Sequence, residues 1–414
     1  MKKIITVVLS ALLVFSCAAF PVGAAESEAN TNYPYIFVHG MMGWGSYDGV
    51  DSLVPYWGVF HGDMLADLQS QGYECYSASV GKLSSNWDRS CELYAQLTGT
   101  RVDYGEVHSA RHFHARYGRS YENAPLMQGW GDIDESGNIR KINLFGHSLG
   151  GPTVRLFAYL MANGAPEEAA ASGDGVSPLF EGGKADWIYS VTTWSAPHNG
   201  APFANPMYDK FGAGYMLAFM ANIIGASPMA SFWDFQLEQF GLTRVKSEGV
   251  KAHFNPDGIK KFVKSDDNCG YDLSIRGAQA MNDSIDIVPD IYYFSYTGEK
   301  DRKLSNGIYV PTIDMSPMLV VSAFATGRLS GVCDGVSLGE EWRPNDGIVP
   351  VISARAPFDE PVVDYTEGAV VEKGVWNFMP VINGMSHVGY MGMDTNDYQQ
   401  YYEYQMSLIN SLGQ

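Results

Sequence analysis

Short apolar runs alternate with longer helical patterns along most of the chain. Four of these runs, at residues 35–38, 142–145, 188–191 and 291–294, are mainly apolar or aromatic and do not alternate with polar positions. Strands that are buried on both faces of a parallel sheet have this pattern, because helices cover each face. The pattern therefore predicts an α/β fold, with a mostly parallel central sheet and helices on both faces.

The N-terminal residues 1–25 have the features of a secretory signal peptide. Two lysines precede an apolar run at residues 4–15, and small residues follow at 22–25. This run is too short to span a membrane, so we expect a secreted protein with no stable membrane span. No linker rich in proline, serine or charge divides residues 26–414, which predicts a single domain.

The charge balance limits the partners of the protein. Acidic residues number 46 and basic residues 27, which gives a net charge of −19 at pH 7. Such an acidic chain binds a phosphate backbone poorly, so we exclude nucleic acid as a partner. Nothing in the sequence implies an obligate protein partner.

A G-x-S-x-G motif at residues 146–150 supplies a candidate nucleophile, Ser148. The motif alone recurs by chance, but here it lies between the apolar run 142–145 and a helical pattern at 154–160. A sharp strand–turn–helix connection exposes the serine hydroxyl and directs the amides of the helix toward developing negative charge. The sequence therefore predicts a serine hydrolase.

A serine nucleophile needs a histidine as base and a carboxylate that orients it, and in this architecture both follow the serine in the chain. We favour His387, which lies in a loop shortly before the C-terminal helical pattern. His198 and His253 are the other downstream histidines, and we interpret them as a structural loop residue and a solvated residue. For the acid we favour Asp346, in a turn beside a short apolar run, over Asp334.

Two backbone amides are needed to stabilise a tetrahedral oxyanion. One is expected from Leu149, which follows the nucleophile. The loop after the first predicted strand should supply the other, and the sequence there nominates Met41.

From about residue 33 onward the chain resembles the secreted bacterial lipases, both the zinc-containing thermoalkalophilic Bacillus-type enzymes and their staphylococcal relatives. The segments that carry the resemblance are VHGMMGWG from Val38, LSSNWDRSCELYAQLTGTRVDYG from Leu83, HARYGRSY from His114, GHSLGG from Gly146, SPLFEGG from Ser177, PHNG from Pro197, YDLS from Tyr271 and NDGIV from Asn345. The resemblance implies an α/β-hydrolase fold and triacylglycerol lipase activity, with Ser148, Asp346 and His387 as the catalytic triad. A broad carboxylesterase or polyester hydrolase on the same scaffold is the alternative, and a non-catalytic lipid-binding protein is a more distant one.

The resemblance also implies a structural zinc site. Taken alone, the His-x-His and His-x3-His spacings are only weakly metal-like. By resemblance, the zinc ligands are Asp88, His108, His114 and Asp272, and His112 is a bystander. Most of these lie in an insertion, residues 83–120, that the zinc would tie to a distant part of the chain.

The sequence contains features both for and against a calcium site. Asp394 and Asp397 fit the aspartate-rich loop of the staphylococcal relatives, and Asp314 lies where the family supplies a further ligand. However, Gly389 stands where the Bacillus-type relatives have a glutamate ligand. The sequence therefore leaves a calcium site open.

An uncharged, methionine-rich segment at residues 211–233 falls where these lipases carry a helical lid, here within residues 203–241. Methionine is flexible and suits a surface that repacks on different acyl chains. We therefore expect a lipid or ester substrate at an oil–water interface, and activation by that interface.

Overall fold

The computed structural model describes residues 32–133, 135, 137–204, 211–243, 254–394 and 397–413. The predicted signal peptide, His253 and residues 205–210 of the predicted lid region lie outside these ranges.

A seven-stranded sheet forms the centre of the molecule, and all neighbouring strands in it are parallel. In spatial order its strands are β13 (Val362–Asp364), β14 (Trp376–Phe378), β7 (Tyr292–Tyr296), β6 (Ile188–Trp194), β5 (Ile142–His147), β1 (Tyr35–Val38) and β2 (Cys75–Ala78). The predicted α/β fold is confirmed, because the four apolar runs identified in the sequence form β1, β5, β6 and β7.

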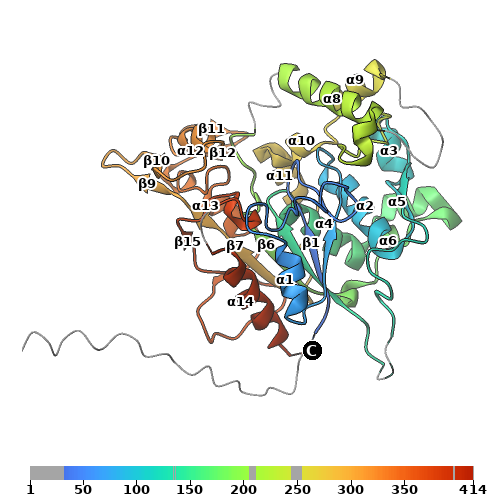
Figure 1. The fold of residues 1–414 in the computed structure, drawn as a ribbon, viewed down its shortest axis with the longest axis horizontal. Coiled ribbons are helices and arrows are strands. Elements are labelled where there is room, and N and C mark those ends of the chain that lie inside the picture. Colours follow the sequence, from blue (N-terminus) through green and yellow to red (C-terminus); the bar gives the residue numbers. More distant parts are fainter. Residues whose placement is uncertain are drawn as a thin grey trace, which may run out of the picture.

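Helices cover both faces of the sheet (Figure 1). The helices of the described ranges are α1 (Met64–Ser70), α2 (Asn86–Thr98), α3 (Glu106–His112), α4 (Gly150–Asn163), α5 (Pro166–Ser172), α6 (Pro178–Glu181), α8 (Phe211–Ala226), α9 (Pro256–Lys264), α10 (Cys269–Leu273), α11 (Ile275–Asn282), α12 (Val320–Thr326), α13 (Val351–Arg355) and α14 (Gln399–Asn410). Ile36 and Val38 of β1 pack in one core with α2 and α4, whereas Tyr35 and Phe37 pack in a second core with α1 and α14. Both faces of the strand are therefore buried, which explains its continuous apolar sequence.

Four two-stranded ribbons lie outside the main sheet. They pair β3 (Arg101–Asp103) with β4 (Tyr117–Ser120), β8 (Gly298–Glu299) with β15 (Ile382–Asn383), β9 (Asp301–Lys303) with β10 (Tyr309–Pro311), and β11 (Val332–Cys333) with β12 (Val336–Ser337). The segment predicted as an insertion contains α2, β3, α3 and β4.

The segment predicted as a lid forms α8 and a short 3-10 helix at Pro228–Ser231. Helices α8 and α9 lie together at the top of Figure 1 and share an apolar cluster. The large side chains of Phe219, Met220 and Ile223 on α8 are exposed. None of the helices in the described ranges is long and apolar enough to cross a membrane.

Candidate active site and metal cluster

The turn between β5 and α4 presents Ser148. Its φ angle of 54° lies in the left-handed region, which a non-glycine residue adopts only under strain. Glycines make room for the turn, because a Cβ on Gly150 would lie 2.2 Å from the carbonyl oxygen of Val38, and one on Gly40 would lie 2.8 Å from the Ser148 Cβ. The motif therefore folds as its sequence predicts.

Three side chains predicted from the sequence lie in one hydrogen-bonded row. The Oγ of Ser148 lies 2.9 Å from Nε2 of His387, and Nδ1 of the same imidazole lies 2.8 Å from Oδ2 of Asp346. The rival acid, Asp334, instead forms an ion pair with Arg276. The three side chains come from three separate segments: Ser148 from the turn after β5, Asp346 from the turn that begins at Asn345, and His387 from the loop before α14.

The carboxylate of Asp346 is buried and fully engaged. Its Oδ1 accepts hydrogen bonds from the amides of Ile348 (2.9 Å) and Val349 (2.8 Å), and its Oδ2 faces His387. Burial raises the pKa of Asp346, but His387 and the two amides outweigh burial and hold this pKa below its usual value. The carboxylate therefore stays ionised and can stabilise an imidazolium.

Two amides beside the serine are available as donors. Within the described chain, the amides of Met41 and Leu149 have no hydrogen-bond acceptor. Their neighbours are engaged: Gly40 N donates to the Tyr56 hydroxyl (3.1 Å), and Met42 N donates to the carbonyl oxygen of Lys82 (3.1 Å). This is the arrangement that an oxyanion hole needs.

A cavity of about 350 Å³ opens beside the serine. It is lined by Ser148 and His387 and by apolar side chains that include Met41, Met42, Trp44, Phe203, Leu273, Met318, Ile348, Val388, Met391 and Met393. An apolar cavity with a few convergent polar groups suits a ligand with a hydrocarbon chain and one polar centre.

A metal cluster forms where the segment of residues 83–120 meets the loop before α10. It contains Asp88, His108, His114 and Asp267, whose nearest nitrogen and oxygen atoms all lie within 4.8 Å of one another. Asp88 Oδ1, Asp267 Oδ2 and Nε2 of both histidines are buried and have no hydrogen-bond partner in the described chain. Four buried polar atoms aimed at one point fit a bound cation, because leaving them unpaired is costly.

The fourth member of this cluster corrects the sequence prediction, which named Asp272. The Asp272 carboxylate accepts a hydrogen bond from the amide of Asn86 (2.5 Å), and burial raises its pKa to about 7. Asp267 lies instead against both histidines, 3.2 Å from His108 and 3.1 Å from His114. His112 stays outside the cluster, as expected, and bonds to Ser265.

A model of a family described as a lipase-like, C-terminal domain matches residues 31–412. The chain belongs to this lipase family. Lipase 2 of Staphylococcus aureus (strain MRSA252) is 35% identical over 388 residues, which make up 92% of this chain and 53% of that protein. The chain therefore spans about half the length of the curated relatives it matches.

Solved structures match this chain over a larger share of their own length than the curated relatives do. The crystal structure of Staphylococcus hyicus lipase has a TM-score of 0.77 and 30% identity, covering 91% of this chain and 96% of that one. EstA from Clostridium botulinum has a TM-score of 0.77 and 35% identity, covering 93% and 89%. The resemblance to staphylococcal lipases that the sequence indicated is confirmed.

In this lipase-family chain, two further residues support the site. The Tyr56 hydroxyl accepts a hydrogen bond from Gly40 N and lies 2.7 Å from Nδ1 of His147, whose Nε2 lies 2.9 Å from the carbonyl oxygen of His387. Burial and the nearby His387 lower the pKa of His147 to about 3, so the ring is neutral. Because Nε2 faces a carbonyl, it carries the proton, and Nδ1 accepts from Tyr56. His147 lies inside the G-x-S-x-G motif, and this position could have indicated that it supports the site. Nothing in the sequence around Tyr56 indicates such a role.

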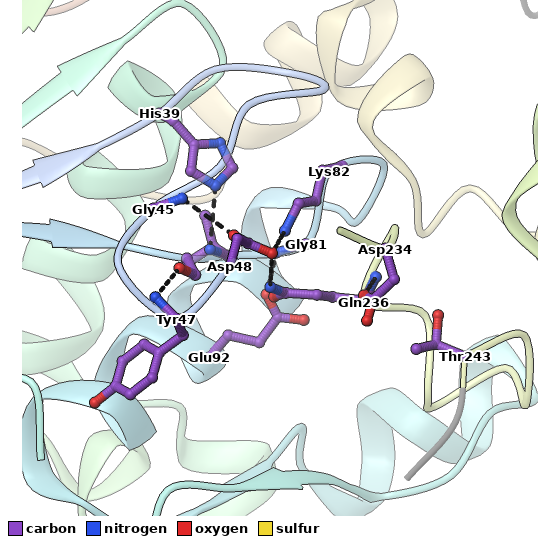
Figure 2. Close-up of polar contacts among 12 residues, drawn as sticks. His39, Gly45, Tyr47, Asp48, Gly81, Lys82, Glu92, Asp234, Gln236 and Thr243 are labelled. Atoms are coloured by element: carbon purple, nitrogen blue, oxygen red, sulfur yellow. Dashed lines mark hydrogen bonds and ion pairs between the residues drawn. The ribbon is translucent and has the colours of Figure 1, made fainter. Parts of the chain in front are cut away.

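A buried ion pair joins Lys82 to Asp48, in the segment that follows His39 (Figure 2). Nζ of Lys82 lies 2.8 Å from Oδ1 of Asp48, and Oδ2 of this aspartate accepts from the amide of Gly45 (3.1 Å). The carbonyl oxygen of Lys82 accepts from Met42 N, and the amide of Lys82 donates to the carbonyl oxygen of Phe235 (3.2 Å), which lies after α8 in the predicted lid region. The loop that carries Met42 and this part of the lid region are therefore held by the same residue.

Two of the three residues that the sequence offered as calcium ligands lie close together, with a lysine between them. Asp314 and Asp394 each lie against Nζ of Lys300, and Asp397 is exposed at the start of the approach to α14. In the described ranges, the metal-like cluster at Asp88 is the only group of three or more candidate ligands.

Proposed function

We propose that this protein is a secreted triacylglycerol lipase. The observation that carries the proposal is the hydrogen-bonded row of Ser148, His387 and Asp346, which opens onto an apolar cavity beside two unengaged amides. The names of its relatives, Lipase 2 and Staphylococcus hyicus lipase, support the same substrate class.

In the proposed reaction, Oγ of Ser148 attacks the ester carbonyl while Nε2 of His387 accepts its proton. The amides of Met41 and Leu149 donate to the oxyanion of the tetrahedral intermediate. The imidazolium, stabilised by Asp346, then protonates the leaving alkoxide. A water molecule, deprotonated by His387, attacks the acyl-enzyme and releases the fatty acid, which restores the serine.

We further propose that α8 is a lid. The exposed Phe219, Met220 and Ile223 give this helix an apolar outer face, and an oil surface would offset the cost of exposing more apolar area when it moves. Activity measured against tributyrin concentration should rise sharply at the solubility limit of the substrate. A smooth saturation curve through that limit would reject the lid.

We assign zinc as the metal of the Asp88, His108, His114 and Asp267 cluster. Two carboxylates and two imidazoles are a donor set that suits tetrahedral zinc, and four protein ligands leave no open position for catalysis. The ion, when bound, would neutralise the two buried carboxylates. Its proposed role is structural, since binding couples to folding.

The decisive experiment is hydrolysis of emulsified triolein by the wild type and by Ser148→Ala, with Ser411→Ala as a matched control near the C-terminus. Loss of the nucleophile should lower the rate of fatty-acid release by about 10⁴-fold or more. The thermal unfolding temperature should stay the same in all three proteins. Rapid Ser148-dependent cleavage of p-nitrophenyl acetate without triolein hydrolysis would instead favour the carboxylesterase alternative.

A further inference from the structure

The ammonium group of Lys300 lies between two of the residues that the sequence offered as possible calcium ligands. Its Nζ lies 3.3 Å from Oδ2 of Asp394 and 3.4 Å from Oδ2 of Asp314. The Lys300 side chain is 2% exposed and that of Asp394 is 6% exposed, so this pair is withdrawn from water, whereas Asp314 reaches in from the surface. One positive charge thus already sits between the two carboxylates.

The surrounding residues do not fit a calcium ion. Calcium takes six to eight oxygen ligands. Here two carboxylates surround a point that the ammonium group of Lys300 already occupies. A side chain at Gly389 could not add a ligand without rearrangement, because its Cβ would lie 2.3 Å from Sδ of Met385 and 3.1 Å from Oδ2 of Asp394. Gly389 therefore supplies no ligand at this point, and Lys300 already supplies a positive charge there.

Lys300 also joins the two loops that bear the acid and the base. Its amide donates to the carbonyl oxygen of Asn345 (3.0 Å), the residue before Asp346. Its ammonium group holds Asp394, whose Oδ2 accepts from the amide of Ser386 (3.3 Å), the residue before His387. Immediately before Lys300, β8 pairs with β15, which lies just ahead of the His387 loop.

We infer that Lys300 is a built-in cation that replaces calcium and positions the Asp346 and His387 loops relative to each other. A lysine ammonium is a compact charge with three donors, so it can bridge carboxylates that a divalent ion would otherwise hold. Lys300 is a positioning residue, since it does not touch the reacting atoms. Its effect on catalysis rests on the proposed ester hydrolysis, whereas its replacement of calcium does not.

The first test measures thermal unfolding of the wild type, saturated with zinc and freed of calcium, as CaCl₂ is added. A ligand that binds the folded state raises the unfolding temperature, so with no calcium site the shift should stay below about 1 °C up to millimolar calcium. A clear concentration-dependent rise would overturn the inference. This readout holds whether or not the protein hydrolyses esters.

The second test compares Lys300→Met, Lys300→Arg and the control Lys303→Met, which removes a half-exposed lysine paired with Glu340. With p-nitrophenyl butyrate, Lys300→Met should lower kcat about tenfold or more with KM within about twofold, because transition-state geometry is lost and the cavity is intact. Lys300→Arg, which keeps the charge, should recover most of kcat.

Equal kcat values for Lys300→Met and Lys303→Met would overturn the positioning role, and so would a Lys300→Arg variant that folds but is as slow as Lys300→Met. If Lys300→Met does not fold, the Arg variant and the calcium titration still decide.

Discussion

The substitution Tyr56→Phe tests how the oxyanion loop is held. It removes one oxygen atom and keeps the ring, which packs against Trp44 and Trp57. The lost hydroxyl accepts from Gly40 N at 3.1 Å and donates to Nδ1 of His147 at 2.7 Å. Both partners are buried, so neither gains water in exchange.

The size of the effect follows from these two bonds. Each buried polar group left without a partner costs about 1–3 kcal/mol, so the free energy of unfolding should fall by about 2–6 kcal/mol. Gly40 directly precedes Met41, and complete loss of an oxyanion donor lowers kcat by about 10²–10³-fold. A donor that is loosened but still present should lower kcat by about 10- to 100-fold, or about 1.4–2.7 kcal/mol in the barrier. KM for a soluble ester should change little, because the apolar lining of the cavity remains.

The assay is initial-rate hydrolysis of p-nitrophenyl butyrate, with chemical unfolding of the same samples. Tyr189→Phe is the matched control, since this buried hydroxyl also has two short contacts, to the carbonyl oxygens of Leu412 and Gly413 at 2.9 Å each. It should lose stability and keep kcat. If Tyr56→Phe is destabilised to the same degree as Tyr189→Phe but retains its kcat within about twofold, the proposed link between Gly40 and the oxyanion hole is refuted.

Three further predictions concern the metal, the pH dependence of stability and the buried ion pair. Asp267→Asn should abolish stoichiometric zinc in purified protein measured by atomic emission, whereas Asp272→Asn should keep it, and the reverse result would restore the sequence-based ligand set. Burial raises the pKa of Asp301 from 3.8 to about 8, so its contribution to stability is full below pH 4 and is lost as the pH rises toward 8. The unfolding free energy of Asp301→Asn should therefore fall less than that of the wild type between these pH values, and parallel curves would disprove the shift. Lys82→Met leaves Asp48 buried without its cation and should cost about 3–5 kcal/mol in urea unfolding, while a loss below about 1 kcal/mol would show that the pair contributes little.

The fold could be predicted because burial on both faces leaves a direct mark on the sequence. The continuous apolar runs of β1, β5, β6 and β7 can only be satisfied in the interior of a covered parallel sheet. The local pattern was less informative in the C-terminal part of the chain. The apolar run at 376–382 is divided, since β14 ends at Phe378 and Ile382 pairs instead with β8.

The candidate triad could be predicted from the sequence for a different reason. Ser148 carries a local signature, and the chain order of the architecture then restricts the acid and base to a few residues. The resemblance named Asp272, which lies within α10, whereas the structure uses Asp267, which lies just before the N-cap of that helix. The choice depends on tertiary contacts, in which Asp272 turns to the amide of Asn86 and Asp267 turns to the histidines. Lys300 left no signal at all, since its partners are far away in the chain.

Helix α2 connects the candidate metal ligands to the candidate active site. Asp88 of this helix faces the metal cluster, and the next residue, Arg89, is fully buried and donates to the carbonyl oxygens of His39 and Gly81 and to the Thr153 hydroxyl. His39 directly precedes the glycine of the oxyanion loop, and Thr153 belongs to the helix behind the nucleophile. Because a helix moves as a rigid unit over one turn, a shift that separates Asp88 from the histidines must also displace the Arg89 guanidinium. A metal bound at this cluster would therefore influence the geometry of the proposed reaction without taking part in its chemistry.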